Sequence, residues 1–489
     1  MSEPAAARLD ALIDRVVGTG CCTGCGMCAQ LDDGLALTLD AHGFARPHRV
    51  GASTADDEAV RTFRAACPGM TVRAQRPGRG AAPAATYHPQ LGPVLACWEA
   101  AATDPDLRHR GSSGGVLSAL AAWATSTGEV AQVVGARAAA DPRRTVSVTI
   151  RTRAEALASA GSRYEPASAA AHPLATDAGG ATIGKPCEAA ALRALSRAQG
   201  APAPLLLSFF CAGTPSAHAT DALVEQLGLA PGQVPDELWY RGRGWPGRFT
   251  VRGPGGEQVS ASYEESWGGV LGPAVQWRCR TCPDGIGESS DVTAGDFWRA
   301  DERGYPVFDE SDGWSALVAR TPRGLDLVRR AVAAGVLTVR PITPDEVMAV
   351  QPSQRKRRRT LAGRLLGARV AGARVPRYRG FGLVRLGGQH LRERLGGDQA
   401  HGRCVAEHEG DAVGREIGID WQVGRAGLQG GEQRHHQFHR TRDRERHRAL
   451  GACAACTQQL REAVGTAVQF GVGHRLALEA QRDGLGPLG

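Results

Sequence analysis

Three cysteines, Cys22, Cys25 and Cys28, stand at regular intervals near the start of the chain, in the run Cys-Thr-Gly-Cys-Gly-Met-Cys. This spacing puts three thiolates on one short loop, which can wrap one face of a [4Fe–4S] cube. Gly24 and Gly26 permit the unusual backbone dihedrals that such a loop requires. The sequence therefore predicts that these three cysteines bind an iron–sulfur cluster.

A fourth ligand is expected at Cys67, which Pro68 follows directly. Proline stops the chain from continuing into a helix and has no N–H. The gap of 38 residues between Cys28 and Cys67 is far longer than in compact bacterial ferredoxins. Cys21 is an adjacent competitor for a ligand position. Two alternatives stay open: a zinc site, which more often uses two paired knuckles, and cysteines that bind no metal.

A second set of cysteines lies further along the chain. Cys279 and Cys282 form a two-ligand half-site, and both Cys187 and Cys211 follow a short predicted strand and precede a predicted helix. Such positions gather at the carboxyl edge of an α/β sheet, where helix N-termini favour anionic thiolates. These four residues are candidates for a second cluster; the alternative is that Cys211 is an ordinary buried cysteine. The strands are expected over 181–184 and 205–210, and the helices over 188–199 and from 214 onward.

The chain has 13 cysteines among 489 residues, an odd number, and clustered cysteines of this kind indicate metal binding in a reducing compartment rather than disulfides. Residues 1–14 lack the basic start and apolar stretch of a signal peptide. No apolar run approaches the roughly 18–20 residues of a membrane span. We therefore expect a cytoplasmic protein without a membrane span.

The order of patterns predicts an α/β (α+β) catalytic domain after a small ferredoxin-like domain. The expected divisions are a ferredoxin-like [4Fe–4S] domain (1–75), a Pro/Ala/Gly linker (76–86), a flavin-binding catalytic domain with the second cluster (87–350), a basic C-terminal extension (351–385) and a tail (386–489). The tail is rich in Gly, Arg, Gln and His. We expect it to be poorly structured, as a disordered or frame-shifted segment, although 460–476 could form a helix.

Two loops could hold a nucleotide or a flavin. The run Gly111-Ser-Ser-Gly-Gly115, with Arg108 and Arg110 just before it, precedes a predicted helix over 116–127. Converging backbone N–H groups, serine hydroxyls and the helix dipole make such a turn suited to phosphate. The alternative is a serine-capped helix after a flexible loop. The second loop, Gly161-Ser-Arg-Tyr164, offers an arginine for phosphate and an aromatic ring for stacking, although an ordinary loop is the simpler interpretation.

The run from Gly179 to Lys185 nearly spells a phosphate-binding P-loop, but Pro186 stands where that loop needs Ser or Thr for magnesium. The sequence therefore argues against ATP binding. Lys185 is one of only two lysines in the chain. It could reach a phosphate or a flavin ring, or be a solvated surface lysine.

Taken in order, these runs resemble a known family, the beta subunits of coenzyme F-420 hydrogenases and dehydrogenases, which includes 7-hydroxymethyl chlorophyll a reductase. The resemblance covers about residues 15–380. The runs that carry it are Cys22–Cys28, Arg110–Gly115, Gly161–Tyr164, Gly184-Lys-Pro-Cys187, Phe210–Gly213, Arg243-Gly-Trp-Pro-Gly247, Cys279-Arg-Thr-Cys282 and Asp291–Trp298.

This resemblance implies FAD and one or two [4Fe–4S] clusters, and it favours the four-cysteine second cluster. It also implies cofactor-binding roles for two loops, and a catalytic role for Lys185 in stabilising the anionic reduced flavin. The implied cofactor-binding residues are Arg110, Ser112, Ser113, Gly114, Gly115, Ser162, Arg163, Tyr164, Gly184 and Lys185.

The function expected from the resemblance is an iron–sulfur flavoprotein oxidoreductase that passes electrons between [4Fe–4S] clusters, FAD and coenzyme F-420 or a similar hydride carrier. One alternative is ferredoxin-dependent reduction of a tetrapyrrole or another biosynthetic intermediate. Another is a non-catalytic electron-transfer subunit. The implied partners are F-420 or another redox substrate, and ferredoxin or a hydrogenase or dehydrogenase subunit.

Three remaining features receive simpler interpretations. The basic run Arg355–Arg359 could bind nucleic acid, but no aromatic residues are interleaved with it. We interpret it as a solvated charged face or a dock for an acidic partner, and expect no nucleic-acid binding. Cys97 lies in an apolar, strand-like run that indicates core packing. Cys453 and Cys456, with Cys404 and the tail histidines, could form a zinc site, although the weak patterning there argues against it.

Overall fold

The computed structural model describes residues 3–75 and 86–396. The chain divides into two compact units, of which the first holds residues 1–361 and 374–390. The second unit contributes only 362–373 and 391–396 to the described part, at the ends of helices α11 (Pro352–Val370) and α12 (Leu383–Gly396). The predictions for most of the linker, for Cys404, Cys453 and Cys456, and for a helix over 460–476 lie outside the described residues.

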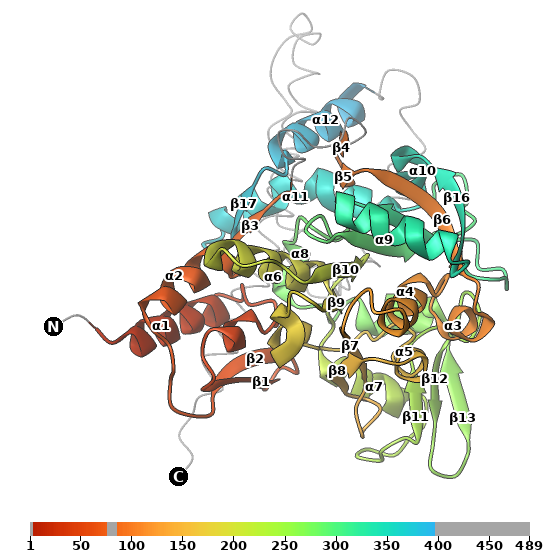
Figure 1. Cartoon of the computed structure of the whole chain (residues 1–489), viewed down its shortest axis with the longest axis horizontal. Helices are drawn as coiled ribbons and strands as arrows, with labels where there is room; N and C mark the ends of the chain where they lie inside the picture. The colour runs from red at the N-terminus through yellow and green to blue at the C-terminus, as the bar shows by residue number, and fades with distance from the viewer. Residues whose placement is uncertain (1–2, 76–85, 397–489) are drawn as a thin grey trace, which may run out of the picture. The chain divides into compact units, whose positions relative to one another are not determined.

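An eight-stranded mixed sheet forms the centre of the first unit (Figure 1), in the order β16-β6-β15-β14-β10-β9-β7-β8. Strands β14, β10, β9 and β7 pair in parallel, and antiparallel strands complete both sides. This arrangement confirms the expected α/β fold class. The strands are β6 (Ala96–Ala102), β7 (Val133–Ala138), β8 (Thr145–Ile150), β9 (Ala181–Gly184), β10 (Leu205–Phe209), β14 (Val292–Asp296), β15 (Ser315–Ala319) and β16 (Leu337–Ile342).

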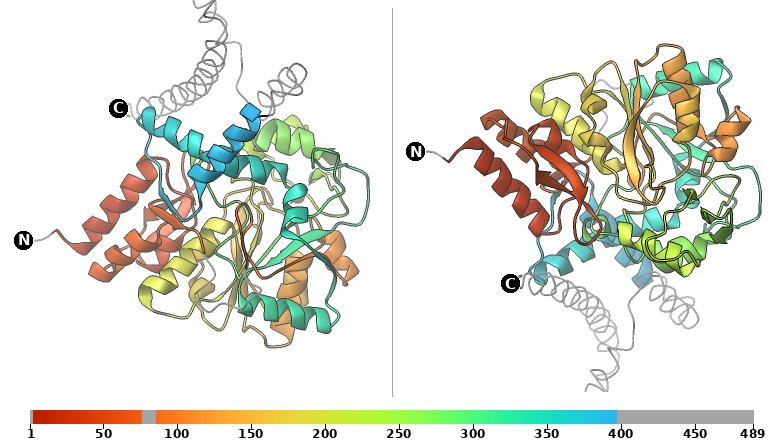
Figure 2. Two further views of the ribbon diagram at one scale, coloured as in Figure 1. Left: turned by 90° about the horizontal axis from the view of Figure 1, so that it is seen from above. Right: turned by 90° about the horizontal axis from the view of Figure 1, so that it is seen from below.

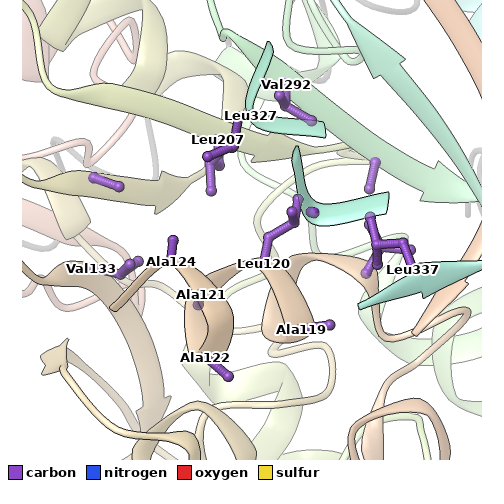
Figure 3. Packing of buried hydrophobic residues seen from close by; sticks show 14 of the residues in the cluster. Ala119, Leu120, Ala121, Ala122, Ala124, Val133, Leu207, Val292, Leu327 and Leu337 are labelled. Carbon is purple, nitrogen blue, oxygen red and sulfur yellow. The ribbon is translucent and has the colours of Figure 1, made fainter. Parts of the chain in front are cut away.

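Both faces of the sheet are covered, which explains why β10 is apolar along most of its length. Side chains alternate between the two faces of a strand. Leu205 and Leu207 therefore join the cluster under α4 (Val116–Ser126) and α9 (Pro322–Ala333), whereas Leu206 joins the cluster of α6 (Pro186–Gln199). Figure 3 shows Leu120 of α4 and Leu327 of α9 in the same cluster as Leu207. The other helices of this unit include α3 (Pro105–Arg110), α5 (Arg153–Ala158), α7 (Ala217–Gln226) and α10 (Pro344–Ala349), with short helices η2 (Ala169–Ala171) and η3 (Pro173–Thr176).

The N-terminal segment consists of two helices and a small antiparallel sheet. Helix α1 (Ala5–Gly18) buries Leu9, Leu12, Ile13 and Val16, a helical spacing that gives it one apolar face. Figure 2 shows α1 and α2, in red, side by side. Their core also includes Ala191 and Leu195 of α6. The other elements here are η1 (Met27–Gln30), β1 (Leu35–Leu39), β2 (Ala45–Arg49), α2 (Asp57–Ala66) and β3 (Thr71–Arg73).

Smaller sheets complete the first unit. One three-stranded sheet packs with α7 and with the π-helical segment η4 around Tyr240 and Phe249. Strand β17 pairs in parallel with β3, which ties residues after α11 to the N-terminal segment. The bounds are β4 (Thr86–His88), β5 (Gly92–Val94), β11 (Glu237–Trp239), β12 (Phe249–Arg252), β13 (Gln258–Ala261), η4 (Glu264–Leu271), α8 (Trp277–Arg280) and β17 (Arg377–Arg379).

Several sequence expectations can be compared directly with these elements. The strands over 181–184 and 205–210 are confirmed to within a residue, and Cys97 is buried in β6 as expected. Helix α7 begins later than expected, because Ser216 is its N-cap and Pro215 lies before it. Residues 386–396 are the part of the expected tail that the structure describes, and they are helical and belong to α12. No helix among the described residues is long and apolar enough to cross a membrane.

The basic run Arg355–Arg359 lies in α11, and the interpretation as a solvated face is wrong for two of its residues. Arg358 is buried and forms an ion pair with the buried Glu288. Arg357 donates to the backbone carbonyls of Cys211 (3.0 Å) and Ala212. These two arginines therefore hold a loop of the sheet domain in place.

Asp291, just before β14, joins three elements of the sheet domain. Its buried carboxylate accepts from Leu206 N (2.8 Å) and Thr321 Oγ1 (2.7 Å), and it pairs with Arg193 (3.0 Å) and Arg323 (2.7 Å). Burial alone would raise the pKa of this carboxyl, but the two arginines outweigh burial and lower it. Asp291 is therefore ionised in the folded chain at neutral pH.

We predict that Asp291→Asn lowers the free energy of unfolding by about 3 kcal/mol, because it leaves two arginines without their buried counter-charge. Guanidinium unfolding at neutral pH measures this loss. Asp326→Asn is the control, since Asp326 pairs with Arg330 on the exposed side of α9; it should cost less than about 1 kcal/mol. Equal losses in the two variants would contradict the role given to Asp291.

Candidate metal and cofactor sites

The loop between α1 and η1 carries Cys22, Cys25 and Cys28 in a tight fold that depends on its two glycines. Gly24 and Gly26 have φ of 67° and 90°, a region that favours glycine. A Cβ on Gly24 would lie 2.7 Å from the carbonyl of Ala45, and one on Gly26 would lie 2.5 Å from Ala171 Cβ. The glycines predicted to shape this loop are therefore required there both by conformation and by space.

Cys67, at the end of α2, completes the first set of thiols. Cys22, Cys25, Cys28 and Cys67 all line one pocket, whose other walls are mostly apolar. All the described cysteines are free thiols. Burial raises the pKa of Cys28 and of Cys67, and the neighbouring cysteines of the set raise both further. Four mutually repelling thiolates at one place fit a site whose charge a bound metal centre offsets.

Cys21, the adjacent competitor, is not among the residues that line this pocket. Its Sγ lies 3.4 Å from the carbonyl oxygen of Arg374, and its side chain is buried. Burial is also the main cause that raises the pKa of the Cys21 thiol. The geometry therefore favours Cys67 over Cys21 as the fourth member of the first set.

The second set is brought together by the register of two parallel strands. Gly184 of β9 stands opposite Ser208 of β10, and each of these residues is followed three positions later by a cysteine, Cys187 or Cys211. Cys187 lies in the first turn of α6, and the carbonyl of Cys211 accepts from Arg357. The two cysteines therefore leave the same edge of the sheet side by side, as predicted.

Cys279 and Cys282 come to the same edge on α8 and the turn after it. Burial and the charges of Cys279 and Cys282 together raise the pKa of Cys211 to about 12. Burial likewise raises the pKa of Cys187, and the charges of Cys25 from the first set and of Cys211 also act to raise it. Cys211 thus lies within electrostatic reach of the other three cysteines of the predicted second set.

The described residues contain no group of three or more His, Cys, Asp or Glu side chains placed to hold a single metal ion. The thiolates that bind a single zinc ion converge on one centre, at about 2.3 Å from the metal. A [4Fe–4S] cube instead takes one thiolate at each of four separate iron corners.

Lys185 lies between the second thiol set and a buried glutamate. Its Nζ donates to Glu188 Oε1 (2.6 Å) and to the carbonyl of Ala167. Burial lowers the pKa of Lys185, but the charge of Glu188, then those of Cys187 and Cys211, outweigh burial and raise it. The alternative of a solvated surface lysine is therefore wrong, and Lys185 is a buried cation beside the second set.

The Gly111–Gly115 turn does precede α4, but serine does not cap that helix. The N-cap is Gly115, at φ 69°, and no side chain accepts from the first turn. Ser113 Oγ instead lies 2.6 Å from Ser315 Oγ, and Ser112 Oγ accepts from the N–H of Ser162 (2.6 Å). The uncapped helix start leaves backbone N–H groups for an anion.

The Gly161–Tyr164 loop reaches this turn, but its arginine is not available for phosphate. Arg163 donates to the carbonyls of Pro142 (2.7 Å), Arg144 (2.9 Å) and Leu238 (3.3 Å). The expected phosphate contact of Arg163 is therefore corrected to a structural role. Tyr164 packs against Trp267 and Tyr240, and Arg110 lies 3.7 Å from Glu237.

Sequence reasoning missed Arg241, which joins both loops. Its buried guanidinium donates to the carbonyl of Ser112 (2.7 Å), to Asp296 (2.7 Å) and to the Tyr164 hydroxyl (3.4 Å). Arg241 also lies over the ring of Trp245, at 5.0 Å. The signal was present in part, because Trp245 and Asp296 belong to two of the runs that carry the family resemblance.

Two family models match this chain, and both describe the beta subunit of coenzyme F420 hydrogenase/dehydrogenase. The model of the N-terminal part of that subunit matches residues 97–172, and the model of its C terminus matches 179–345. Together they extend over about half of the chain and include the central sheet. The fold and the matches define a subunit of an oxidoreductase. The chain belongs to the coenzyme F420 hydrogenase/dehydrogenase beta subunit family.

Among solved structures, the chain is similar to one from the F420-reducing [NiFe] hydrogenase complex of Methanosarcina barkeri. The two are 20% identical with a TM-score of 0.42, and the similarity covers 56% of this chain and 96% of that one. The search of curated proteins gave no match.

The buried carboxyl of Glu165 makes the stability of the folded chain depend on pH. Burial raises its pKa to about 7, although Thr145, Arg144 and Arg163 oppose this shift. Because the folded pKa exceeds the unfolded one, the folded chain holds a proton that the unfolded chain releases between about pH 4.5 and pH 7. The stability contributed by that proton is lost as the pH rises through this window.

We therefore predict that Glu165→Gln is more stable relative to wild type at about pH 8 than at about pH 5. Chemical unfolding of both proteins at the two pH values measures the difference. A stability difference that is the same at both values would show that Glu165 is not the buried acid described here.

Proposed function

We propose that this chain is an iron–sulfur flavoprotein that passes electrons between two [4Fe–4S] clusters, FAD and coenzyme F-420 or a similar hydride carrier. The observation that carries the proposal is the gathering of eight free thiols into two sets of four. Family membership supports the redox role. When bound, the clusters supply one-electron transfer and the flavin supplies hydride exchange.

Cys22, Cys25, Cys28 and Cys67 are the proposed ligands of the first cluster. The apolar walls of their pocket, which include Ile13, Val16 and Phe63, keep water away from the thiolates. Low solvent exposure is one of the means by which a protein sets a cluster potential. This set lies outside the residues that the family models match.

Cys187, Cys211, Cys279 and Cys282 are the proposed ligands of the second cluster. Lys185 places a positive charge beside this set, where it partly offsets four thiolates. We therefore propose that Lys185 acts on the second cluster. This assignment differs from direct stabilisation of the reduced flavin, which is the role that the family resemblance implies.

The flavin is proposed to bind at the start of α4. The uncapped N–H groups after Gly115 and the guanidinium of Arg110, which remains partly exposed, suit the phosphates. Arg241 fixes the Ser112 carbonyl and Asp296 beside them. Asp296 ends β14, which pairs in parallel with β10, so this site shares a sheet edge with the second thiol set.

We predict that Cys67→Ala and Cys282→Ala each lower the iron content from about eight to about four atoms per chain. Iron and acid-labile sulfide assays on anaerobically purified protein measure this change. Cys21→Ala is the matched control, because Cys21 is a buried neighbour that does not line the first pocket. Iron loss in the Cys21 variant, or a full complement in the Cys67 variant, would contradict the assigned ligands.

The substrate is tested by adding reduced F-420 to the same anaerobic protein and recording its absorption spectrum. The proposal expects both the flavin and the cluster bands to bleach. Bleaching by reduced ferredoxin but not by reduced F-420 would favour the tetrapyrrole-reductase alternative. Clusters without any flavin band would favour an electron-transfer subunit.

A further inference from the structure

Arg278, in the short helix α8, is a fully buried arginine with 1% of its surface exposed. Burying an unpaired charge is costly unless another charge or several hydrogen bonds compensate for it. Among the described residues no carboxylate forms an ion pair with Arg278. Its Nε and Nη1 atoms also have no hydrogen-bond partner there. The guanidinium therefore lacks a carboxylate counter-charge within the part of the chain that the structure describes.

The surroundings of Arg278 indicate where that counter-charge lies. The second-set thiolates of Cys282, Cys279 and Cys187 are within electrostatic reach of the guanidinium. Its Nη2 donates to the carbonyl of Pro68 (3.1 Å), the residue directly after the first-set ligand Cys67. The ring of Tyr378, 5.5 Å from the guanidinium carbon, covers the group.

A second side chain of the same segment also spans the two thiol sets. Gln276, just before α8, donates from Nε2 to the carbonyl of Thr23 in the first cysteine loop (3.1 Å). The same nitrogen lies 3.6 Å from Cys279 Sγ of the second set. Gln276 and Arg278 therefore each contact the backbone of the first cysteine region from a segment that carries Cys279 of the second set.

Building on the function proposed above, we propose that Arg278 is the counter-charge of the second cluster and raises the reduction potential of that cluster. A cluster held by four thiolates is anionic, and each added electron increases that negative charge. A buried cation stabilises the reduced state more than the oxidised state, because charges interact strongly where water is excluded. Arginine suits this position because it stays protonated.

The positive charge of Arg278 acts more strongly on the second cluster than on the first. Arg278 stands directly before the second-set ligand Cys279 on α8, whereas its contact toward the first set is the hydrogen bond to the Pro68 carbonyl. The positive charge therefore favours an electron on the second cluster. That cluster shares its sheet edge with Asp296 and the proposed flavin site, so Arg278 biases electrons from the first cluster toward the flavin.

The test is an EPR-monitored redox titration of the anaerobic full-length protein with dithionite as reductant. The redox transition that is missing from the titration of the Cys282→Ala variant is assigned to the second cluster. Arg278→Met and Arg278→Gln remove the charge, and the Gln variant keeps an amide that can donate to Pro68 if the Met variant does not fold. Both are expected to shift the second-cluster midpoint to a more negative value, with a smaller shift for the first.

Two further variants separate charge from packing. Arg278→Lys keeps the charge and is expected to stay near the wild-type midpoint. Arg320→Gln removes another buried guanidinium, whose acceptors include the carbonyls of Leu91, Pro93 and Ile286; it should leave both midpoints unchanged.

Unchanged midpoints in the neutral Arg278 variants would overturn the inference, as would equal shifts of the two clusters. Shifts of the same size in Arg278→Lys would assign the effect to packing and also overturn it. Wild-type protein without any cluster signal would instead contradict the proposed function, on which this inference rests.

Discussion

The packing of eight thiols into two sets, the first mostly buried and the second half-buried, is the constraint on which the rest of the structure depends. Thiolates that are buried together repel one another, and each set raises the pKa of its own members. Two buried cations accompany these thiols: Lys185 lies beside the second set, and Arg278 directly precedes Cys279 and donates to the carbonyl of Pro68. Neither group can move to water, so the charge balance that they require must come from within the chain and its bound groups.

The sheet explains why cysteines distant in sequence meet. Parallel pairing of β9 with β10 brings Cys187 and Cys211 to one edge, and the same edge carries Asp296 at the end of β14. Arg357, in the first half of α11, donates to the carbonyl of Cys211 at this edge. The carboxyl edge of these parallel strands thus positions the second thiol set, the proposed flavin site and the residues between them.

Local pattern was enough to predict part of this arrangement. The Cys22–Cys28 spacing and its glycines indicated a loop, and apolar runs located β9, β10 and their following cysteines. Contacts between distant segments were beyond such reasoning. The sequence suggested that Arg163 could bind phosphate, but its guanidinium donates to three backbone carbonyls. The sequence also suggested a solvated Arg358, but that side chain forms an ion pair with Glu288. Arg278 gave no signal at all, because its burial depends on Pro68 and Tyr378.

We propose that each thiol set binds an iron–sulfur cluster and that Arg278 lies beside the second one. An anomalous difference map recorded at the iron absorption edge, from crystals of anaerobically purified protein, tests it most directly. The expected result is two compact iron clusters, with Arg278 beside the second. One should lie among Cys22, Cys25, Cys28 and Cys67, and the other among Cys187, Cys211, Cys279 and Cys282. A single ion at either set, or iron at only one of them, would contradict it.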